Sequence, residues 1–338
     1  MVGLIAAIIV CNSFIGVDSR FLITKKDVQL NIPKSFPKPL YNFKNNALTP
    51  EIFMLGRRLF YDPILSKDST ISCASCHQNF AAFSHIDHKL SHGINGLIGT
   101  RNVPALQNLI WKDELMWDGG VNHLEIQPIN PITNPIEMNE SLAHVIEKLK
   151  YDSVYKIMFA IAFKNKEINS ENLLKSLAQF TGLMISVNSK YDKFMAGKDT
   201  FSMAEKKGLV LFRSKCANCH KEPLFTDNSY RNNGIQPDTS LKDMGRGKIT
   251  GKETDNYLFK VPSLRNIEMT YPYMHDGRFR RLKDVLNHYS NADKYTANSD
   301  SSLYKIGILS DNEKKDVVAF LLTLTDLDFL YDKRFLVH

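Results

Sequence analysis

Two cysteines separated by two residues and followed at once by a histidine occur twice in this chain, and this pattern constrains it more than any other feature. The spacing is the attachment signature of a c-type haem. In a helical turn, positions i, i+3 and i+4 share one face, so two thiols can reach the porphyrin vinyl groups while the histidine lies beneath the iron. The sequence therefore predicts two covalently bound haems c. The predicted attachment residues and proximal ligands are Cys73, Cys76 and His77 in the first motif and Cys216, Cys219 and His220 in the second.

Two other uses of cysteine pairs fit the sequence less well. The pairs lie roughly 140 residues apart and each has an adjacent histidine, whereas zinc modules usually bring their half-sites close in sequence. A thioredoxin-like redox pair would need a βαβ pattern, and the chain after Cys76 shows no such alternation. The fifth cysteine, Cys11, is left over, so no structural disulfide is expected.

Length and charge set the broad class. At 338 residues with 43% hydrophobic content, the chain is long enough for about two domains, and one haem per domain is the natural division. The net charge is +7, but Lys and Arg are scattered among acids instead of forming a block, so no nucleic-acid partner is expected. A basic face could still steer an acidic electron donor.

The first 20 residues look like an export signal. An apolar run from Val2 to Val10 has signal-peptide length, although no Lys or Arg precedes it. We expect export to the periplasm, because covalent haem attachment usually takes place outside the cytoplasm. Cys11 is a candidate for a lipid anchor, although the bulky Val10 is a poor fit before it. No segment beyond residue 20 is long and apolar enough to span a bilayer.

Proline content and turn residues divide the rest of the chain. Residues 21–48 contain three prolines and are predicted to be an extended lead-in. Residues 197–199, which begin with Gly197, are the predicted joint between domains. We assign residues 49–197 to a first haem domain and residues 198–338 to a second.

Helices are expected at both ends of each haem domain. Thr49 and Pro50 indicate a helix start, and residues 77–137 read as a long loop, which inside a compact domain is usually functional. Further helices are predicted at 141–150, 154–163 and 171–195, and capping boxes predict helix starts at Ser202 with Glu205 and at Ser310 with Glu313. A helix, the haem motif, a loop and a closing helix are the layout of a small cytochrome domain. The predicted fold is mainly α, with two c-type cytochrome domains, the first enlarged.

Several separate motifs, in order along the chain, resemble those of the bacterial di-haem cytochrome c peroxidases. The resemblance covers about residues 50 to 330 and implies reduction of hydrogen peroxide to water. The first haem would be peroxidatic, and the second would accept electrons from a small donor protein, a cytochrome c or a cupredoxin. Relatives are often dimers, so a homodimer is also expected. The matching stretches include Arg101-Asn102-Val103-Pro104, Trp117-Asp118-Gly119, Ile136-Glu137-Met138, the segment 259–266 and the segment 272–277.

The resemblance assigns catalytic roles around the first haem. Glu137 matches the distal glutamate that moves a proton between the peroxide oxygens, and Gln127 matches the distal glutamine; a solvated loop carboxylate is the alternative for Glu137. His92 matches the histidine that caps the peroxidatic iron in the resting enzyme. His85 and His88 compete with it, and all three could be surface histidines.

Other matches concern electron transfer and a metal. Trp117 matches the tryptophan between the haems, where an indole can shorten the electron-transfer gap, although a core aromatic residue is the alternative. Asn102, Thr270 and Pro272 match a calcium position, the last two through their backbone carbonyls. Without a carboxylate cluster, such a site would be largely hydrated.

One position departs from the peroxidase pattern. Tyr289 stands where the family usually has the distal methionine of the second haem, with Met274 and His288 as other candidate ligands. In this respect the chain resembles the methylamine-utilisation di-haem branch, whose enzymes oxidise tryptophans of a protein through high-valent iron. That activity is the alternative function. A pure electron carrier is disfavoured because it has no use for Glu137 and Gln127.

Overall fold

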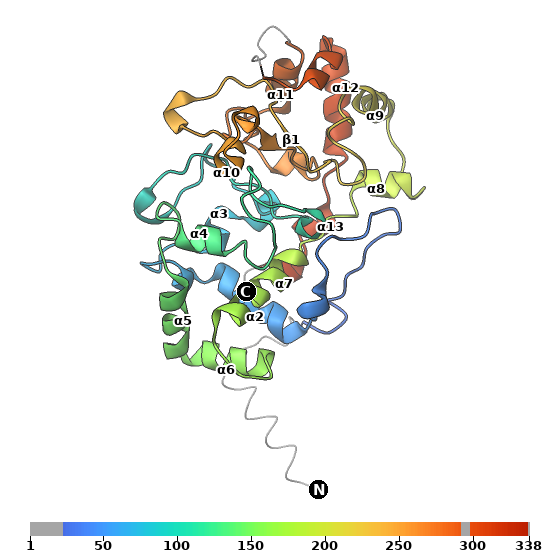
Figure 1. Ribbon diagram of the computed structural model, residues 1–338. Coiled ribbons are helices and arrows are strands. Elements are labelled where there is room, and N and C mark those ends of the chain that lie inside the picture. The colour runs from blue at the N-terminus through green and yellow to red at the C-terminus, as the bar shows by residue number, and fades with distance from the viewer. Residues whose placement is uncertain (1–22, 292–297, 337–338) are drawn as a thin grey trace.

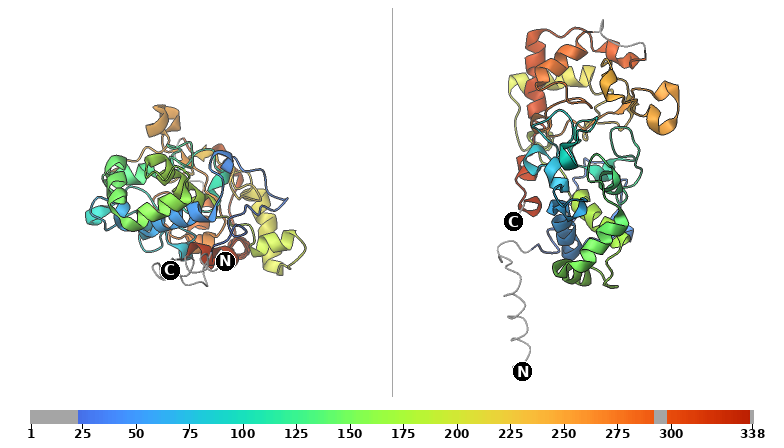
Figure 2. Two further views of the ribbon diagram at one scale, coloured as in Figure 1. Left: turned by 90° about the horizontal axis from the view of Figure 1, so that it is seen from below. Right: turned by 90° about the vertical axis from the view of Figure 1, so that its left-hand side faces the viewer.

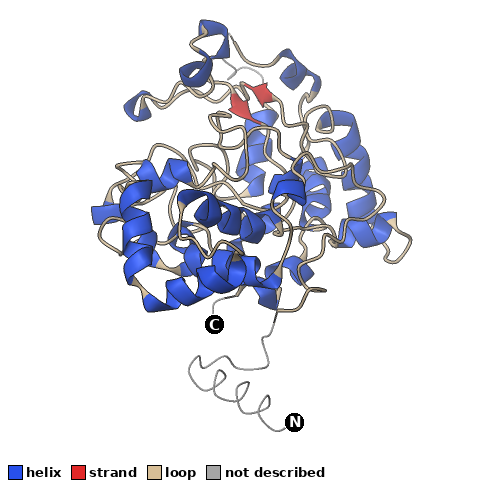
Figure 3. Cartoon of the chain, turned by 60° about the horizontal axis from the view of Figure 1, so that its bottom comes forward, coloured by secondary structure: helices blue, strands red, loops and turns tan. Residues whose placement is uncertain are grey.

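The computed structural model describes residues 23–291 and 298–336, so the leader and Cys11 lie outside the described part of the chain. Helices and loops dominate it, and its strands are β1 (Tyr230–Arg231) and β2 (Phe259–Lys260), which pair antiparallel (Figure 3). The predicted mainly α class is therefore confirmed. Within the same residues, no helix reaches the length and apolarity that crossing a bilayer requires.

Two groups of helices follow one another along the chain and occupy opposite ends of the molecule (Figures 1 and 2). The first group is α2 (Pro50–Tyr61), α3 (Cys73–Cys76), α4 (Ile129–Thr133), α5 (Leu142–Tyr151), α6 (Ser153–Ala162) and α7 (Ser170–Gly182). The second is α8 (Lys190–Met195), α9 (Met203–Lys215), α10 (Gly247–Thr250), α11 (Leu282–Tyr289) and α12 (Asp311–Leu322). The last helix, α13 (Leu327–Leu330), returns to the first group.

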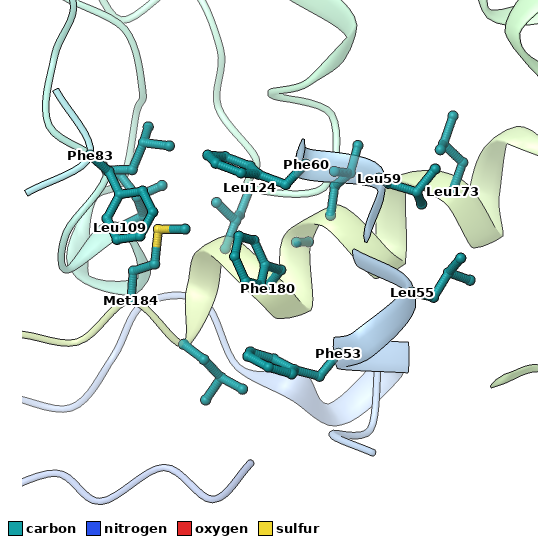
Figure 4. Close-up of a cluster of buried hydrophobic side chains, with 14 of the residues drawn as sticks. Phe53, Leu55, Leu59, Phe60, Phe83, Leu109, Leu124, Leu173, Phe180 and Met184 are labelled. Carbon is teal, nitrogen blue, oxygen red and sulfur yellow. The ribbon is translucent and has the colours of Figure 1, made fainter. Parts of the chain in front are cut away.

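Each end has its own hydrophobic core. The first contains Phe53, Phe60 and Phe180 between α2 and α7, with the Phe60 and Phe180 ring centroids 5.0 Å apart (Figure 4). The second contains Phe212 and Phe320 between α9 and α12, also 5.0 Å apart. Burying one such side chain contributes about 1.5–3 kcal/mol. The C-terminal segment from α13 to residue 335 packs its phenylalanines into the first core, although it follows the second group of helices.

The same helix crossing is used in both halves. A Cβ at Gly56 of α2 would lie 1.9 Å from the backbone oxygen of Ser176 on α7, and a Cβ at Gly208 of α9 would lie 1.9 Å from that of Asp316 on α12. Only glycine lets the two backbones approach so closely. The repeated layout expected from the sequence is thus visible in the packing of the helices.

Local sequence signals placed most helix starts correctly. Thr49 accepts a hydrogen bond from the Ile52 N–H at the start of α2, and the predicted capping boxes begin α9 and α12. The continuous helix predicted over 171–195 is wrong, because α7 ends at Gly182 and α8 begins at Lys190. Between them, the Ser186 N–H donates to the side-chain oxygen of Asn108 instead of continuing a helical ladder.

The loop region also contains a repeat. The same backbone path occurs in two segments, Val103 to Val121 and Val261 to Phe279. In each, an asparagine with a left-handed backbone precedes a 3₁₀ turn, and a small hairpin follows that contains a methionine and a glycine with left-handed backbones. The corresponding residues are Asn108 and Asn266, Met116 and Met274, Trp117 and His275, and Gly119 and Gly277.

The two copies of this loop bind each other reciprocally. The Asn102 N–H donates to the carbonyl oxygen of His275 at 2.7 Å, and the Lys260 N–H donates to the carbonyl oxygen of Trp117 at 2.8 Å. Asn102 and Lys260 are themselves corresponding residues, so the junction between the halves has approximate two-fold symmetry. This symmetry places Trp117 at the contact between the halves.

Candidate functional site

The first motif forms one helical turn, α3, followed by a tight loop. His77 is held by a hydrogen bond of 2.7 Å between its Nδ1 and the carbonyl oxygen of Phe83. Since a carbonyl can only accept, Nδ1 carries the proton and Nε2 keeps its lone pair. Ala82 and Phe83 have left-handed backbones, with φ of 52° and 59°, which turn that carbonyl toward the ring. Desolvation lowers the pKa of His77 to about 4, so the imidazole is neutral at pH 7.

The second motif uses the same arrangement. Nδ1 of His220 lies 3.1 Å from the carbonyl oxygens of both Phe225 and Pro262. Phe225, like Phe83, has a left-handed backbone, with φ of 55°. Desolvation lowers the pKa of His220 as well. A backbone carbonyl at the second ring nitrogen is the usual way in which proteins orient a metal-bound histidine.

The four motif cysteines are each partly exposed, and none of them forms a disulfide with a described residue. Desolvation raises the pKa of Cys76 to about 11, with a further contribution from Glu137, and Cys76 Sγ lies 3.2 Å from the carbonyl oxygen of His92. Reduced thiols beside an oriented neutral imidazole are what covalent haem attachment requires. The residues of both motifs therefore fit a haem c.

A cavity of about 270 Å³ borders the second motif and extends toward the junction of the halves. Its lining includes Cys216, Cys219 and His220 together with Tyr289 and Met274, and also Trp117 and Gln127.

The candidate distal ligands of the second motif differ in their surroundings. Tyr289 ends α11 and borders the cavity, as does Met274, whose sulfur accepts a hydrogen bond of 3.4 Å from the Asn233 amide. His288 is bound elsewhere, because its Nε2 lies 2.8 Å from the carbonyl oxygen of Asn233. Ligation by Tyr289 or Met274 stays a prediction.

Glu137 lies beside the first motif. Its Oε1 accepts a hydrogen bond of 2.9 Å from the Asn134 amide, and its charge acts on the thiols of Cys73 and Cys76. Desolvation raises the pKa of Glu137, an effect that the hydrogen bond from Asn134 partly offsets. A carboxyl group with a raised pKa next to a reaction centre is suited to accept and return a proton near neutral pH.

The His92 loop packs directly on the Glu137 segment. The Ile94 N–H donates to the Glu137 carbonyl oxygen at 2.8 Å, and a Cβ at Gly93 would lie 1.8 Å from the carbonyl oxygen of Ile136. His92 pairs with Ile98 across a small hairpin. The loop is therefore fixed at its base, where only glycine fits.

The three histidines that compete as caps form one cluster. The ring centroids of His88 and His92 are 4.2 Å apart, and those of His85 and His88 are 5.1 Å apart. Desolvation lowers the pKa of His92, and the neighbouring His88 lowers it further. Proximity alone does not select which of the three caps an iron, so the assignment of His92 stays a prediction.

Trp117 is held in place at the junction. Its indole N–H donates to the carbonyl oxygen of Asn102 at 2.8 Å, and its ring borders the cavity together with Gln127. Gln127 Nε2 lies 3.9 Å from the sulfur of Met116, the residue before Trp117. The predicted distal glutamine thus contacts the residue that precedes the predicted relay, and both border the same cavity.

The predicted calcium residues also line this cavity. Asn102 is buried and donates its amide N–H to the carbonyl oxygen of Lys89 at 2.9 Å, while Thr270 and Pro272 border the same space. Among the described residues, no group of three His, Cys, Asp or Glu side chains is arranged to hold a metal ion. Calcium stays a prediction that depends on neutral oxygen ligands.

Two features of the candidate site were not foreseen from the sequence. The carbonyls of Phe83 and Phe225 orient both histidines, but a backbone carbonyl leaves no signature in the sequence. Lys112 also faces the cavity, where desolvation and, to a lesser extent, the charge of Lys260 lower its pKa to about 8. The repeated Val-Pro-x-Leu pattern at Val103 and Val261 could have revealed the pairing of the loops.

Comparisons with known proteins identify the family of this chain. A family model described as di-haem cytochrome c peroxidase matches residues 50–200. The methylamine utilization protein MauG of Methylorubrum extorquens is 37% identical over 299 residues, which cover 86% of this chain and 82% of that protein. This chain belongs to the di-haem cytochrome c peroxidase family.

Other members of the family are similarly close. Cytochrome c551 peroxidase of Nitrosomonas europaea is 34% identical over 288 residues, or 82% of each chain. The crystal structure of a MauG-like protein associated with microbial copper homeostasis superposes with a TM-score of 0.83 at 31% identity, covering 91% of this chain and 98% of that one. Membership confirms the resemblance inferred from the motifs, identifies a peroxidase-type oxidoreductase and implies two haems.

Proposed function

We propose that this peroxidase-family protein reduces hydrogen peroxide to water with electrons from a small donor protein. Each peroxide takes up two electrons and two protons and yields two waters. The first half binds and cleaves the peroxide, and the second half receives electrons one at a time from a cytochrome c or a cupredoxin. Two haems c, held by the two cysteine motifs with His77 and His220 as proximal ligands, would supply the redox chemistry.

Glu137 carries the proposal. It lies next to the thiols of the first motif, its pKa is raised by desolvation, and Asn134 fixes its orientation. In the proposed reaction Glu137 takes the proton from one peroxide oxygen and returns it to the other, which then leaves as water. The cavity at the second motif is instead bordered by Tyr289 and Met274.

Other residues of this chain have positioning roles. Gln127 would donate a hydrogen bond to the bound peroxide, and Trp117 would shorten the gap that electrons cross between the halves. His92 would close the first site until electrons reach the second half. Periplasmic localisation belongs to the same proposal, because a small soluble donor and exported haem proteins meet there.

The test is donor oxidation by the mature protein with peroxide, compared between wild type and Glu137→Gln. Loss of a general acid–base residue lowers turnover by about 10²- to 10⁴-fold. Glu147→Gln is the matched control, because Glu147 is an exposed glutamate on α5. Turnover of Glu137→Gln within a factor of two of wild type would contradict the assignment.

One observation favours a second function. Tyr289 borders the cavity at the position where the family usually has methionine, and MauG of Methylorubrum extorquens is among the similar proteins. The alternative is an oxidase of the methylamine-utilisation type that acts on tryptophans of a protein partner. In the same experiment, that function would give a long-lived oxidised protein and little donor turnover.

A further inference from the structure

A groove on the surface of the second half carries a strongly basic lining. It has a volume of about 630 Å³ and lies between the start of α11, the outer face of α12 and the loop of residues 268–273. Its two carboxylates, Glu268 and Asp311, face a larger number of cationic side chains. These are Arg280, Arg281, Lys283, Lys314 and Lys315. We call this surface the cationic groove.

Some of this positive charge is balanced locally and some is not. Arg281 binds Asp284 at 2.9 Å, and Lys314 lies 4.0 Å from Asp311. Lys283 and Lys315 are exposed and form no ion pair with another described residue. Surface cations without partners create a field that attracts anions over about a Debye length, roughly 10 Å at 0.1 M salt.

The cationic groove and the cavity at the second motif share one wall. Tyr273 lines both spaces, and the residue after it is Met274, which faces the cavity. The floor of the groove also contains the apolar side chains of Val318 and Leu322, and Leu322 is 40% exposed. An apolar floor within a charged rim is typical of sites where proteins meet briefly.

We propose that the cationic groove docks a small redox protein that presents a patch of carboxylates, and that electrons enter the second half through the wall at Tyr273. This inference rests on the proposed function, because it names the surface and the charge of the electron donor. Each encounter moves one electron. The donor is oxidised by one unit, the second half is reduced by one unit, and two encounters serve one peroxide.

The charge of the groove selects the partner. A basic donor would meet the unpaired Lys283 and Lys315 as like charges, whereas an acidic donor would be steered toward them. Steering of this kind raises association rates by 10- to 1,000-fold and weakens steeply with added salt. We therefore expect fast, salt-sensitive reduction by an acidic donor.

The test uses the mature full-length protein and two reduced probes, an acidic plastocyanin and a basic mitochondrial cytochrome c. Stopped-flow absorbance gives the bimolecular rate at which each probe reduces protein that one equivalent of peroxide has oxidised, and calorimetry gives the affinity of the resting protein for each probe. Lys283→Glu combined with Lys315→Glu should lower the plastocyanin rate at least 10-fold at low salt and weaken binding. Lys156→Glu with Lys164→Glu, two exposed lysines in or next to α6 of the first half, is the matched control and should change the rate less than 2-fold.

The outcomes distinguish failure of the docking proposal from failure of the proposed function. A plastocyanin rate and affinity unchanged in the groove variant, or lost equally in the control, would overturn the docking proposal. So would faster reduction of the wild type by the basic cytochrome. Reduction by hydroquinone, a neutral small molecule, should be equal in all variants and shows that the variants are folded. Peroxide turnover driven by hydroquinone tests the proposed function separately, since it needs no docking.

Discussion

The two halves of this chain orient the motif histidine in the same way but differ in the other residues that lie near each motif. His77 and His220 are both oriented by the carbonyl of a left-handed phenylalanine, and both helix pairs cross at a glycine. Near the first motif lies Glu137, the proposed proton carrier, whereas the cavity at the second motif is bordered by Tyr289. The comparison teaches that the two halves share the packing around the motif histidine. In the proposed function, residues outside this shared packing separate peroxide chemistry from electron uptake.

The largest effect on stability is expected at the two glycine helix crossings, where the halves are most alike. Gly56→Ala and Gly208→Ala each force a Cβ against a backbone oxygen 1.9 Å away, so the crossing helices must separate. Overpacking of this kind costs about 1–3 kcal/mol or more, which lowers the thermal midpoint by several degrees. Gly120→Ala is the control, because its Cβ would meet side-chain atoms and no backbone, namely the end of Ile249 at 3.1 Å and Asp118 Oδ1 at 3.2 Å. Equal midpoints for all three variants would show that the crossings are not tight.

The next largest effect concerns electron transfer and distinguishes Trp117 from His275, the corresponding residue in the second loop. Trp117→Phe removes the indole and its hydrogen bond to Asn102, so electron transfer from the second half to the first should slow. His275→Phe changes the symmetry-related residue, which stacks on Phe259 with ring centroids 3.6 Å apart, and should leave that rate nearly unchanged. Flash or stopped-flow reduction of the second half, followed at the first, measures both rates. A larger effect from His275→Phe would reverse the roles assigned to the loops.

A spectroscopic prediction concerns the difference between the distal sides. Tyr289→Phe should change the visible and electron paramagnetic resonance spectra of the second haem and raise its reduction potential, because an anionic oxygen ligand favours ferric iron. Met274→Leu should leave those spectra as in wild type. The opposite pattern would make Met274 the ligand and would bring the second half closer to the usual peroxidase arrangement.

The smallest effect is a shift in pH dependence. Glu137 must be ionised to take a proton, so turnover is lost as the pH falls through its pKa, which lies above the ordinary range for glutamate. The hydrogen bond from Asn134 lowers that pKa, so Asn134→Ala should raise it and move the acid limb of kcat/KM to higher pH. A pH profile of the variant measures the shift. An acid limb that moves to lower pH would exclude Glu137 as the titrating group.

The sequence predicted helix starts correctly where the interaction that starts the helix joins residues close together in the chain. Thr49, Ser202 and Ser310 predicted helix starts because a side-chain cap is encoded within four residues. They failed between α7 and α8, where Asn108, far away in sequence, binds the backbone at Ser186 and ends the helical pattern.

The candidate site was predictable for side chains that carry chemistry and not for backbone groups that position them. The cysteine motifs were proposed from residue type and spacing and Glu137 from the family resemblance, and the structure places Glu137 beside the first motif. The carbonyls of Phe83 and Phe225 were not, because any residue has a carbonyl and only the folded turn directs it. The reciprocal pairing of Asn102 with His275 also required the structure, since it joins distant segments.

The most direct test of the division of labour is a single turnover. Fully reduced protein is mixed rapidly with one equivalent of hydrogen peroxide while the absorbance of both haems is followed. We predict that one peroxide oxidises both haems by one electron each in wild type, and that Glu137→Gln slows this oxidation by about 10²- to 10⁴-fold while its reduction by the donor stays fast. Oxidation of one haem only, or wild-type speed in Glu137→Gln, would contradict the account.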